Sequence, residues 1–215
     1  MGVLFAKTCV LCGGALEAGG KAMLCPSCAG EVRREYRCAE TFSVPGADGA
    51  AAALWYKGRV RDAMRKFKFN GAQYMAEWFA AQTVPLLAAH LEDWRPDLVT
   101  FMPIGPLHYR KRGYNQAELL AKPIAAALSL PCIPTLRKRL FSQTQSEQAD
   151  RAARLKNAER SVLPKSGVQL TGKSVVLVDD IVTTGATAAA AVKALREMGA
   201  ARVYVLTPTK TPHGR

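Results

Sequence analysis

The sequence lacks any long uninterrupted apolar run, and its first residues do not resemble a signal peptide. The most apolar stretch, residues 76–91, is broken by polar residues and a proline: Glu77, Gln82, Thr83, Pro85 and His90. A membrane-spanning helix is therefore not predicted there. Residues 1–7 are too short to form the apolar region of a signal peptide, and cysteines follow almost at once. We expect a cytoplasmic protein that does not insert into a membrane.

Acidic residues are also scarce. The chain has 17 Asp and Glu against 30 Lys and Arg, which gives a formal net charge of +13. The excess is concentrated, because residues 54–70 hold six basic residues and one acid, and residues 105–140 hold seven and one. Such clustering favours polyanionic ligands, namely pyrophosphate, nucleic acid or both. A basic face that is merely solvated explains the charge equally well.

Four of the six cysteines form two Cys-x-x-Cys pairs, made by Cys9 with Cys12 and by Cys25 with Cys28. Each pair brings two thiolates to one ion, and four thiolates complete a tetrahedral zinc site. Redox activity is the alternative reading of Cys-x-x-Cys, but paired motifs favour structural Zn²⁺. A site closed by four cysteines has no open position for catalysis, so we assign it to folding or docking.

The length of 215 residues suits one domain of moderate size with a small appendage. Residues 1–40 are predicted to form a zinc-binding module. Residues 41–53 are small and contain Pro45, Gly46 and Gly49, which predicts a linker. Residues 54–215 then form the main domain.

The most informative stretch is VVLVDDIVTTGAT, residues 175–187. Residues Val175 to Val178 are apolar and mostly β-branched, which predicts a buried strand. Residues Ala186 to Leu195 are rich in alanine and predict a helix. In an open α/β sheet, ligands lie just beyond the carboxyl ends of the strands. The turn between this strand and this helix is such a place.

The residues of the turn indicate a sugar phosphate. Asp179 and Asp180 can accept hydrogen bonds from the two hydroxyls of a ribose diol. The first amides of the helix have no partner within the helix, so with the helix dipole they favour a phosphate. The predicted cradle consists of Thr183, Thr184, Gly185, Ala186 and Thr187. An ordinary solvated turn is the alternative, but two adjacent acids ending a buried strand are costly without a partner. A Walker P-loop is excluded because no Gly-Lys-Ser/Thr follows.

Residues 54–71 are predicted to begin as a short strand and to become helical after Gly58. Val60, Met64 and Phe67 share one helical face. The basic residues of this helix are candidates for binding nucleic acid: Arg59, Arg61, Arg65, Lys66 and Lys68. An amphipathic helix with a charged outer face is the alternative.

A second basic cluster, Arg110, Lys111 and Arg112, is predicted on a loop between a strand at 97–102 and a helix at 116–128. Several donors close together suit pyrophosphate, although a solvated basic turn is the alternative. Asn115 is predicted to cap the helix, with Glu118 completing a capping box.

The remaining elements are predicted from the positions of proline and glycine and from the periodicity of apolar residues. We expect a helix at 72–91 that is interrupted at Pro85, and a kink at Pro123. Residues 141–148 resemble an active-site lid, and 150–159 predict a short helix. A last parallel strand is expected at 202–206, with a loose tail from Pro208.

The 175–187 stretch resembles the phosphoribosyl pyrophosphate (PRPP) signature of type I phosphoribosyltransferases, and the whole layout resembles the ComF family. The shared motifs are Tyr56, Gly58, Arg61, Lys68, Phe69 and Gly71; Arg112, Gly113, Asn115 and Gln116; Arg154 and Asn157; and the PRPP loop at 178–187. The chain departs from the family after Asn157, where Ala158, Glu159 and Arg160 replace Gly-Ala-Phe.

The resemblance implies an α/β fold, a Rossmann-like parallel sheet of about five strands beneath a hood made by residues 54–71. It also implies PRPP bound with Mg²⁺, the ion being held mainly by diol, pyrophosphate and water. Members of the family are associated with natural transformation, which implies single-stranded DNA and proteins of the DNA-uptake machinery as partners.

Catalysis is left open by the sequence. Purine-salvage relatives carry an acid that serves as general base where this chain has Thr183, and a threonine cannot do that work at neutral pH. One hypothesis is therefore an enzyme that transfers phosphoribose from PRPP to an unknown acceptor. The other is a PRPP-binding accessory protein for DNA uptake, whose basic segments carry single-stranded DNA, with aromatic residues that stack bases or belong to the core.

Overall fold

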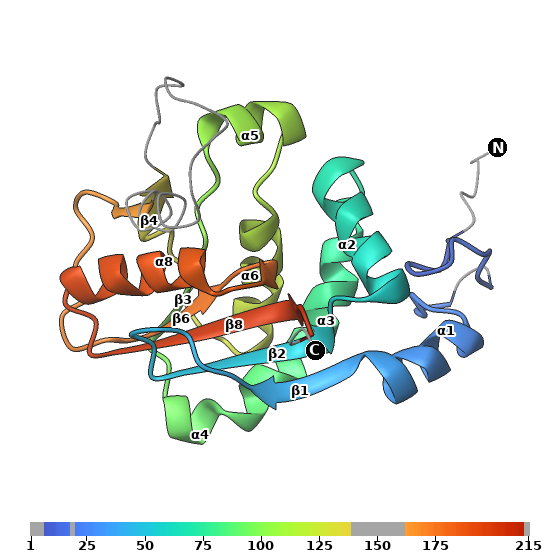
Figure 1. Ribbon diagram of the computed structural model, residues 1–215, viewed down its shortest axis with the longest axis horizontal. Helices are drawn as coiled ribbons and strands as arrows, with labels where there is room; N and C mark the ends of the chain where they lie inside the picture. Colours follow the sequence, from blue (N-terminus) through green and yellow to red (C-terminus); the bar gives the residue numbers. More distant parts are fainter. Residues whose placement is uncertain (1–6, 18–19, 139–161, 213–215) are drawn as a thin grey trace.

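The computed structural model describes residues 7–17, 20–138 and 162–212 (Figure 1). The predicted lid at 141–148, the predicted helix at 150–159, and Arg154 and Asn157 lie outside these ranges. No helix within them is long and apolar enough to cross a membrane.

A six-stranded sheet forms the centre of the fold, with the order β1-β2-β8-β6-β3 and with β7 paired to β8. All neighbours are parallel except β1, which is antiparallel to β2. The strands are β1 (Arg37–Thr41), β2 (Gly49–Trp55), β3 (Leu98–Phe101), β6 (Ser174–Val178), β7 (Ile181–Val182) and β8 (Arg202–Lys210). A separate antiparallel pair consists of β4 (Leu136–Lys138) and β5 (Val162–Pro164). The predicted α/β class with a mostly parallel sheet is confirmed.

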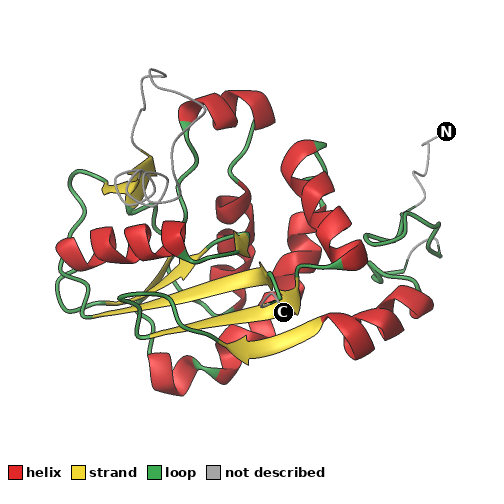
Figure 2. Ribbon diagram, in the orientation of Figure 1, coloured by secondary structure: helices red, strands yellow, loops and turns green. Residues whose placement is uncertain are grey.

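Helices cover the sheet (Figure 2). They are α1 (Pro26–Glu31), the π-helical turn η1 (Val32–Tyr36), α2 (Gly58–Phe69), α3 (Met75–Ala89), α4 (Leu91–Trp94), α5 (Pro106–Arg112), α6 (Gln116–Ala127) and α8 (Ala186–Glu197). The chain crosses from β2 through α3 to β3 in one direction and from β6 through α8 to β8 in the other. Because such crossovers are right-handed, α3 and α8 lie on opposite faces of the sheet.

The predicted linker at 41–53 is wrong in its second half. Residues 49–53 belong to β2, where Ala50, Ala51, Ala52 and Ala53 are buried and the strand pairs in parallel with β8. A run of alanines carries little strand signal of its own, and only pairing with a distant strand makes it one. Since β1 also pairs with β2, the chain that follows the cysteines joins the main sheet directly.

Three prolines are accommodated where the sequence predicts a break or a loose end. Pro85 lies inside α3 and Pro123 inside α6, and neither helix ends there. Pro208 lies inside β8, which continues to Lys210 because β2 and β7 pair with it. Packing against neighbouring elements outweighs the local cost of each proline.

Candidate functional site

A cavity of about 310 Å³ lies at the carboxyl ends of β3 and β6. The two strands are parallel and in register from Leu98 opposite Val175 to Phe101 opposite Val178. The cavity is lined by the end of α2, the loop after β3, the junction of α5 with α6, and the stretch 179–188. Strand ends therefore bring the predicted sugar-phosphate turn together with segments that are 60 to 110 residues earlier in the chain.

The predicted strand, turn and helix are found at the expected residues. All five residues of β6 are buried, and α8 begins at Ala186. The backbone amide of Asp179 donates to the carbonyl of Leu206 over 3.1 Å, so the turn starts as an extension of the sheet. The short strand β7 within the turn was not predicted, and it pairs with the far end of β8.

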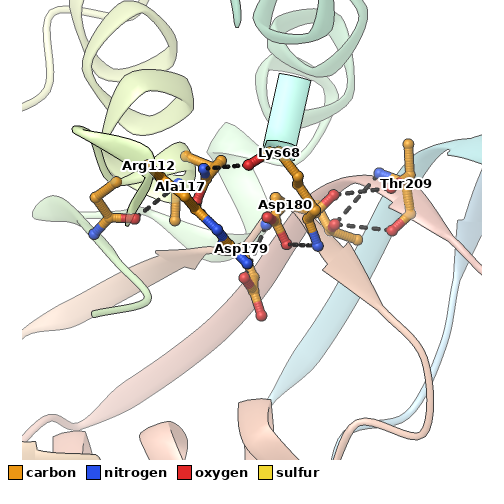
Figure 3. A network of polar contacts seen from close by, with 9 residues as sticks. Lys68, Arg112, Ala117, Asp179, Asp180 and Thr209 are labelled. Atoms are coloured by element: carbon orange, nitrogen blue, oxygen red, sulfur yellow. Dashed lines mark hydrogen bonds and ion pairs between the residues drawn. The ribbon is translucent and has the colours of Figure 1, made fainter. Parts of the chain in front are cut away.

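Two carboxylates stand at the head of this turn (Figure 3). Oδ1 of Asp179 accepts a hydrogen bond from the amide of Asp180 over 2.9 Å. The side chain of Asp180 is 12% exposed, and its Oδ1 lies 2.9 Å from Nζ of Lys68. The carbonyl of Asp180 accepts a hydrogen bond from Oγ1 of Thr209 over 2.8 Å. Both acids line the cavity, and Asp180 is fixed on its backbone side and at its carboxylate.

The opposite end of the turn offers donors. Gly185 precedes α8 with φ +78°, a backbone conformation that glycine adopts without strain. Thr183 and Thr184 are exposed, and the amide of Ala186 is 3.5 Å from Oγ1 of Thr184, at the limit of a hydrogen bond. The first amides of this 12-residue helix thus point into a region suited to an anion.

The three predicted pyrophosphate-binding residues lie on α5, which is a helix rather than the predicted loop. This helix has a proline in its first turn and ends at Gly113, which has φ +80°. Both residues are typical of helix boundaries. Arg112 lines the cavity, donates to Oε1 of Gln116 over 3.1 Å, and lies 4.9 Å from the ring centroid of Phe69. Arg110 and Lys111 are exposed and do not line it.

Asn115 holds the start of α6 beside the cavity. Its Oδ1 accepts from the amide of Ala117 over 3.1 Å, which confirms the predicted cap. Its Nδ2 donates to the carbonyl of Met102 over 3.0 Å, which ties α6 to the loop after β3. Glu118 instead forms an ion pair with Lys122 over 2.7 Å.

The five basic residues predicted as nucleic-acid candidates separate into two groups. Lys68 lines the cavity and pairs with Asp180, and Arg59 contacts the cysteine cluster. Arg61, Arg65 and Lys66 are exposed. The sequence missed the place of Lys68 in the cavity, since nothing in its own helix indicates a carboxylate more than a hundred residues later.

Burial, together with the neighbouring charge of Asp180, raises the pKa of Asp179 from 3.8 to about 8. In the unfolded chain this carboxyl group loses its proton near pH 4. Between the two values the folded state binds more protons than the unfolded state, so the carboxyl group makes folding less favourable as the pH rises.

We therefore expect the ligand-free Asp179→Asn variant to lose a component of pH dependence. The free energy of unfolding of the wild type, minus that of the variant, should fall between about pH 4 and about pH 8 and be constant above. Urea denaturation at a series of pH values measures both curves. A difference that does not change with pH would show that the pKa of Asp179 is not raised in the folded protein.

The four predicted metal ligands lie together. The sulfur atoms of Cys9, Cys12, Cys25 and Cys28 are all within 4.8 Å of one another, and those of Cys12 and Cys25 are 3.9 Å apart. Tetrahedral coordination with Zn–S bonds of about 2.3 Å places sulfur atoms about 3.8 Å apart. The cluster therefore fits a metal such as zinc.

The cysteine segment docks on the start of α2. Nη1 of Arg59 donates to Sγ of Cys28 over 3.2 Å and lies 3.6 Å from Oε2 of Glu31. The hydroxyl of Tyr36 donates to Oε1 of Glu31 over 2.8 Å and accepts from the amide of Arg59 over 3.3 Å. Gly58 permits this approach, because a Cβ there would lie 2.4 Å from the Tyr36 hydroxyl oxygen.

Gly58→Ala is expected to lower the free energy of unfolding by about 2–4 kcal/mol, through the left-handed backbone and the clash together. Gly71→Ala is the matched control, because Gly71 has φ +68° but nothing within 4 Å of an added Cβ; it should lose only about 1–2 kcal/mol. Tyr36→Phe should restore part of the loss in the Gly58→Ala background. Equal losses at the two glycines, measured by urea denaturation, would show that the docking contact is absent.

The comparisons with known proteins agree with this geometry. A family model described as "Phosphoribosyl transferase domain" matches residues 115–215. Competence protein ComFC of Streptococcus pneumoniae is 32% identical over 149 residues, which are 69% of this chain and 62% of that protein. Competence protein F of Haemophilus influenzae is 34% identical over 109 residues, or 48% and 47% of the two chains. DNA utilization protein YhgH of Salmonella typhi is 35% identical over 113 residues, or 51% and 48%.

This chain spans less than two thirds of the length of each of these relatives. Among solved structures, a purine phosphoribosyltransferase from Pyrococcus horikoshii is 19% identical with a TM-score of 0.40, covering 60% of this chain and 71% of that one.

Proposed function

Because this chain is a ComF-family protein with a type I phosphoribosyltransferase-like domain, we propose that its cavity binds PRPP. The observation that supports this most is the composition of the cavity. Two carboxylates and the start of a helix follow one buried parallel strand, and an arginine from α5 faces the same space. PRPP has a diol, a 5′-phosphate and a pyrophosphate, and each has a matching group here.

The proposed roles follow from chemistry and placement. Asp179 and Asp180 accept hydrogen bonds from the ribose hydroxyls. Residues 183–187 hold the 5′-phosphate through amides and hydroxyls, since the helix dipole favours negative charge there. Arg112 binds the pyrophosphate from the cavity wall, and the exposed Arg110 and Lys111 add positive charge outside it.

Two metal ions belong to this proposal. Mg²⁺ would accompany PRPP, held mainly by ligand oxygens and water, and it would neutralise pyrophosphate charge. The fit on the protein side rests on the paired carboxylates, because a nearby cation would offset the burial that raises the pKa of Asp179. Zn²⁺ in the four-cysteine cluster would serve folding or docking, since four thiolates leave no open position.

A catalytic version of this function is the second candidate. An active transferase would move the phosphoribosyl group to an unknown acceptor and release pyrophosphate. Thr183, which takes the position of the base in purine-salvage enzymes, is exposed and cannot accept a proton at neutral pH. The cavity supports binding more directly than it supports turnover.

A titration with PRPP, with and without Mg²⁺, tests both candidates in one sample. Calorimetry reports binding, and a coupled pyrophosphate assay with nucleobases, amines and DNA as acceptors reports turnover. Saturable heat with no pyrophosphate supports the binding protein. Pyrophosphate release that depends on an acceptor supports the enzyme. Absence of saturable heat would refute the proposal.

DNA handling in uptake and transformation is proposed from the printed names of the relatives and from charge. The net charge is +13, and Arg61, Arg65 and Lys66 are exposed on α2, which ends at Phe69, a residue that is 61% exposed. Exposed cations next to an aromatic ring suit a single strand. The affinity for a labelled oligonucleotide should fall steeply with salt. A salt-independent affinity would exclude binding of the single strand by these basic residues. Contact with DNA-uptake proteins in the cytoplasm is proposed from the names of the relatives alone.

A further inference from the structure

Helix α2 lies between the cysteine segment that leads into α1 and the helices α5 and α6 (Figure 1). It has 12 residues, so it is about 18 Å long. Arg59 in its first turn contacts Cys28, and Lys68 in its last turn contacts Asp180. One rigid element thus carries a residue for each site.

The cluster end of α2 is held by charge. Nη1 of Arg59 is 3.2 Å from Sγ of Cys28 and 3.6 Å from Glu31. Four thiolates around one divalent metal carry two net negative charges, which an adjacent guanidinium stabilises. Metal bound by the four sulfur atoms would hold the Cys28 sulfur in one place, so Arg59 would anchor the first turn of α2 against it.

The middle of α2 transmits displacement because it is packed in the core. Val60, Ala63, Met64 and Phe67 are buried, and the ring of Phe67 lies 6.0 Å from that of Phe79. Nε2 of Gln116, which lines the cavity, donates to the carbonyl of Lys68 over 3.4 Å. A close-packed helix of this kind moves as a unit rather than bending.

The cavity end of α2 orients a carboxylate. The side chains of Lys68 and Asp180 are 17% and 12% exposed, and Nζ is 2.9 Å from Oδ1. A carboxylate has about four acceptor positions, so Asp180 retains capacity for a diol beside this ion pair. Lys68 therefore fixes the direction of the Asp180 carboxylate.

We propose that Lys68 is a positioning residue for the ribose-binding carboxylate Asp180, and that the four-cysteine cluster sets its position through Arg59 and α2. The proposal rests on the proposed binding of PRPP. Metal in the cluster anchors the first turn of α2, and the anchored helix holds Lys68 against Asp180. The cavity then binds PRPP more tightly when the cluster holds metal.

The test compares Arg59→Met with Lys57→Met in the full-length, zinc-loaded protein. Both variants lose one positive charge near the start of α2, and Lys57 is exposed and contributes to neither site. Metal content and thermal unfolding are measured first, and PRPP affinity with Mg²⁺ is then measured by calorimetry. Arg59→Met should bind PRPP on the order of tenfold more weakly than Lys57→Met at equal metal content. If Arg59→Met does not fold, Arg59→Gln, which also removes the charge, is used with the same criterion.

A double variant tests the route. Lys68→Met removes the ion pair with Asp180 at the cavity end of α2. In that background, adding Arg59→Met should lower the PRPP affinity little further. Full additivity of the two losses would exclude α2 as the connection, and equal affinities of Arg59→Met and Lys57→Met would overturn the coupling itself. If the wild type binds PRPP, either of these outcomes leaves the proposed function intact and refutes only the connection through α2. If the wild type does not bind PRPP, the proposed function and the coupling are both refuted.

Discussion

Asp180→Ala is expected to abolish measurable PRPP binding. The substitution removes one of the two proposed acceptors for the ribose hydroxyls and leaves Lys68, whose side chain is 17% exposed, without its carboxylate partner. Hydrogen bonds to charged groups contribute about 1.5–3 kcal/mol each, so the affinity should fall by more than about a hundredfold. Calorimetric titration with PRPP and Mg²⁺ measures the loss.

Asp62→Ala is the matched control, since it also removes one negative charge. Asp62 lies on α2, is exposed and pairs with its neighbour Arg61. It should retain PRPP affinity, and both variants should retain the metal content of the wild type. Unaltered PRPP affinity in Asp180→Ala would refute the assignment of the site.

Cys28→Ser is expected to release the metal and to lower the melting temperature by on the order of 10 °C. Cys28 is fully buried, belongs to the sulfur cluster and accepts from Arg59. Structural zinc contributes about 10–16 kcal/mol to the folding of small modules, and three remaining ligands retain only part of it. In a domain of this size a loss of 1 kcal/mol lowers the melting temperature by about 2–4 °C.

Cys132→Ser is the control for this substitution, because Cys132 is partly buried and is not part of the cluster. It should keep full metal content and nearly the wild-type melting temperature. Metal is measured by mass spectrometry after exposure to a competing chelator. Full occupancy in Cys28→Ser would show that the four thiols are not a shared site.

The parts that were predicted correctly depend on neighbours in the sequence. The strand before Asp179 and the helix after Gly185 follow from residue type over a few positions. The cap at Asn115 follows from one side chain and an amide two residues later. The cysteine spacing brings two ligands together within each Cys-x-x-Cys pair, so the sequence alone predicts the cluster.

The parts that were missed depend on partners far away along the chain. Residues 49–53 look like a linker because alanine has no strong preference for a strand, and only β8 makes them one. Arg110, Lys111 and Arg112 are equivalent in the sequence, but the helical turn of α5 brings only Arg112 to the cavity. Lys68 is one base among five on its helix until folding places Asp180 beside it.

The sequence alone is enough to identify the candidate chemistry of this protein: two acids and a helix start that suit a sugar phosphate, and four thiols that suit a metal. These depend on groups held at short range by the covalent chain. Only the tertiary structure decided which distant side chains complete each site, and that α2 lies between them. The reason is that parallel strands pair across long crossovers, so the residues that meet at their carboxyl ends share no local pattern.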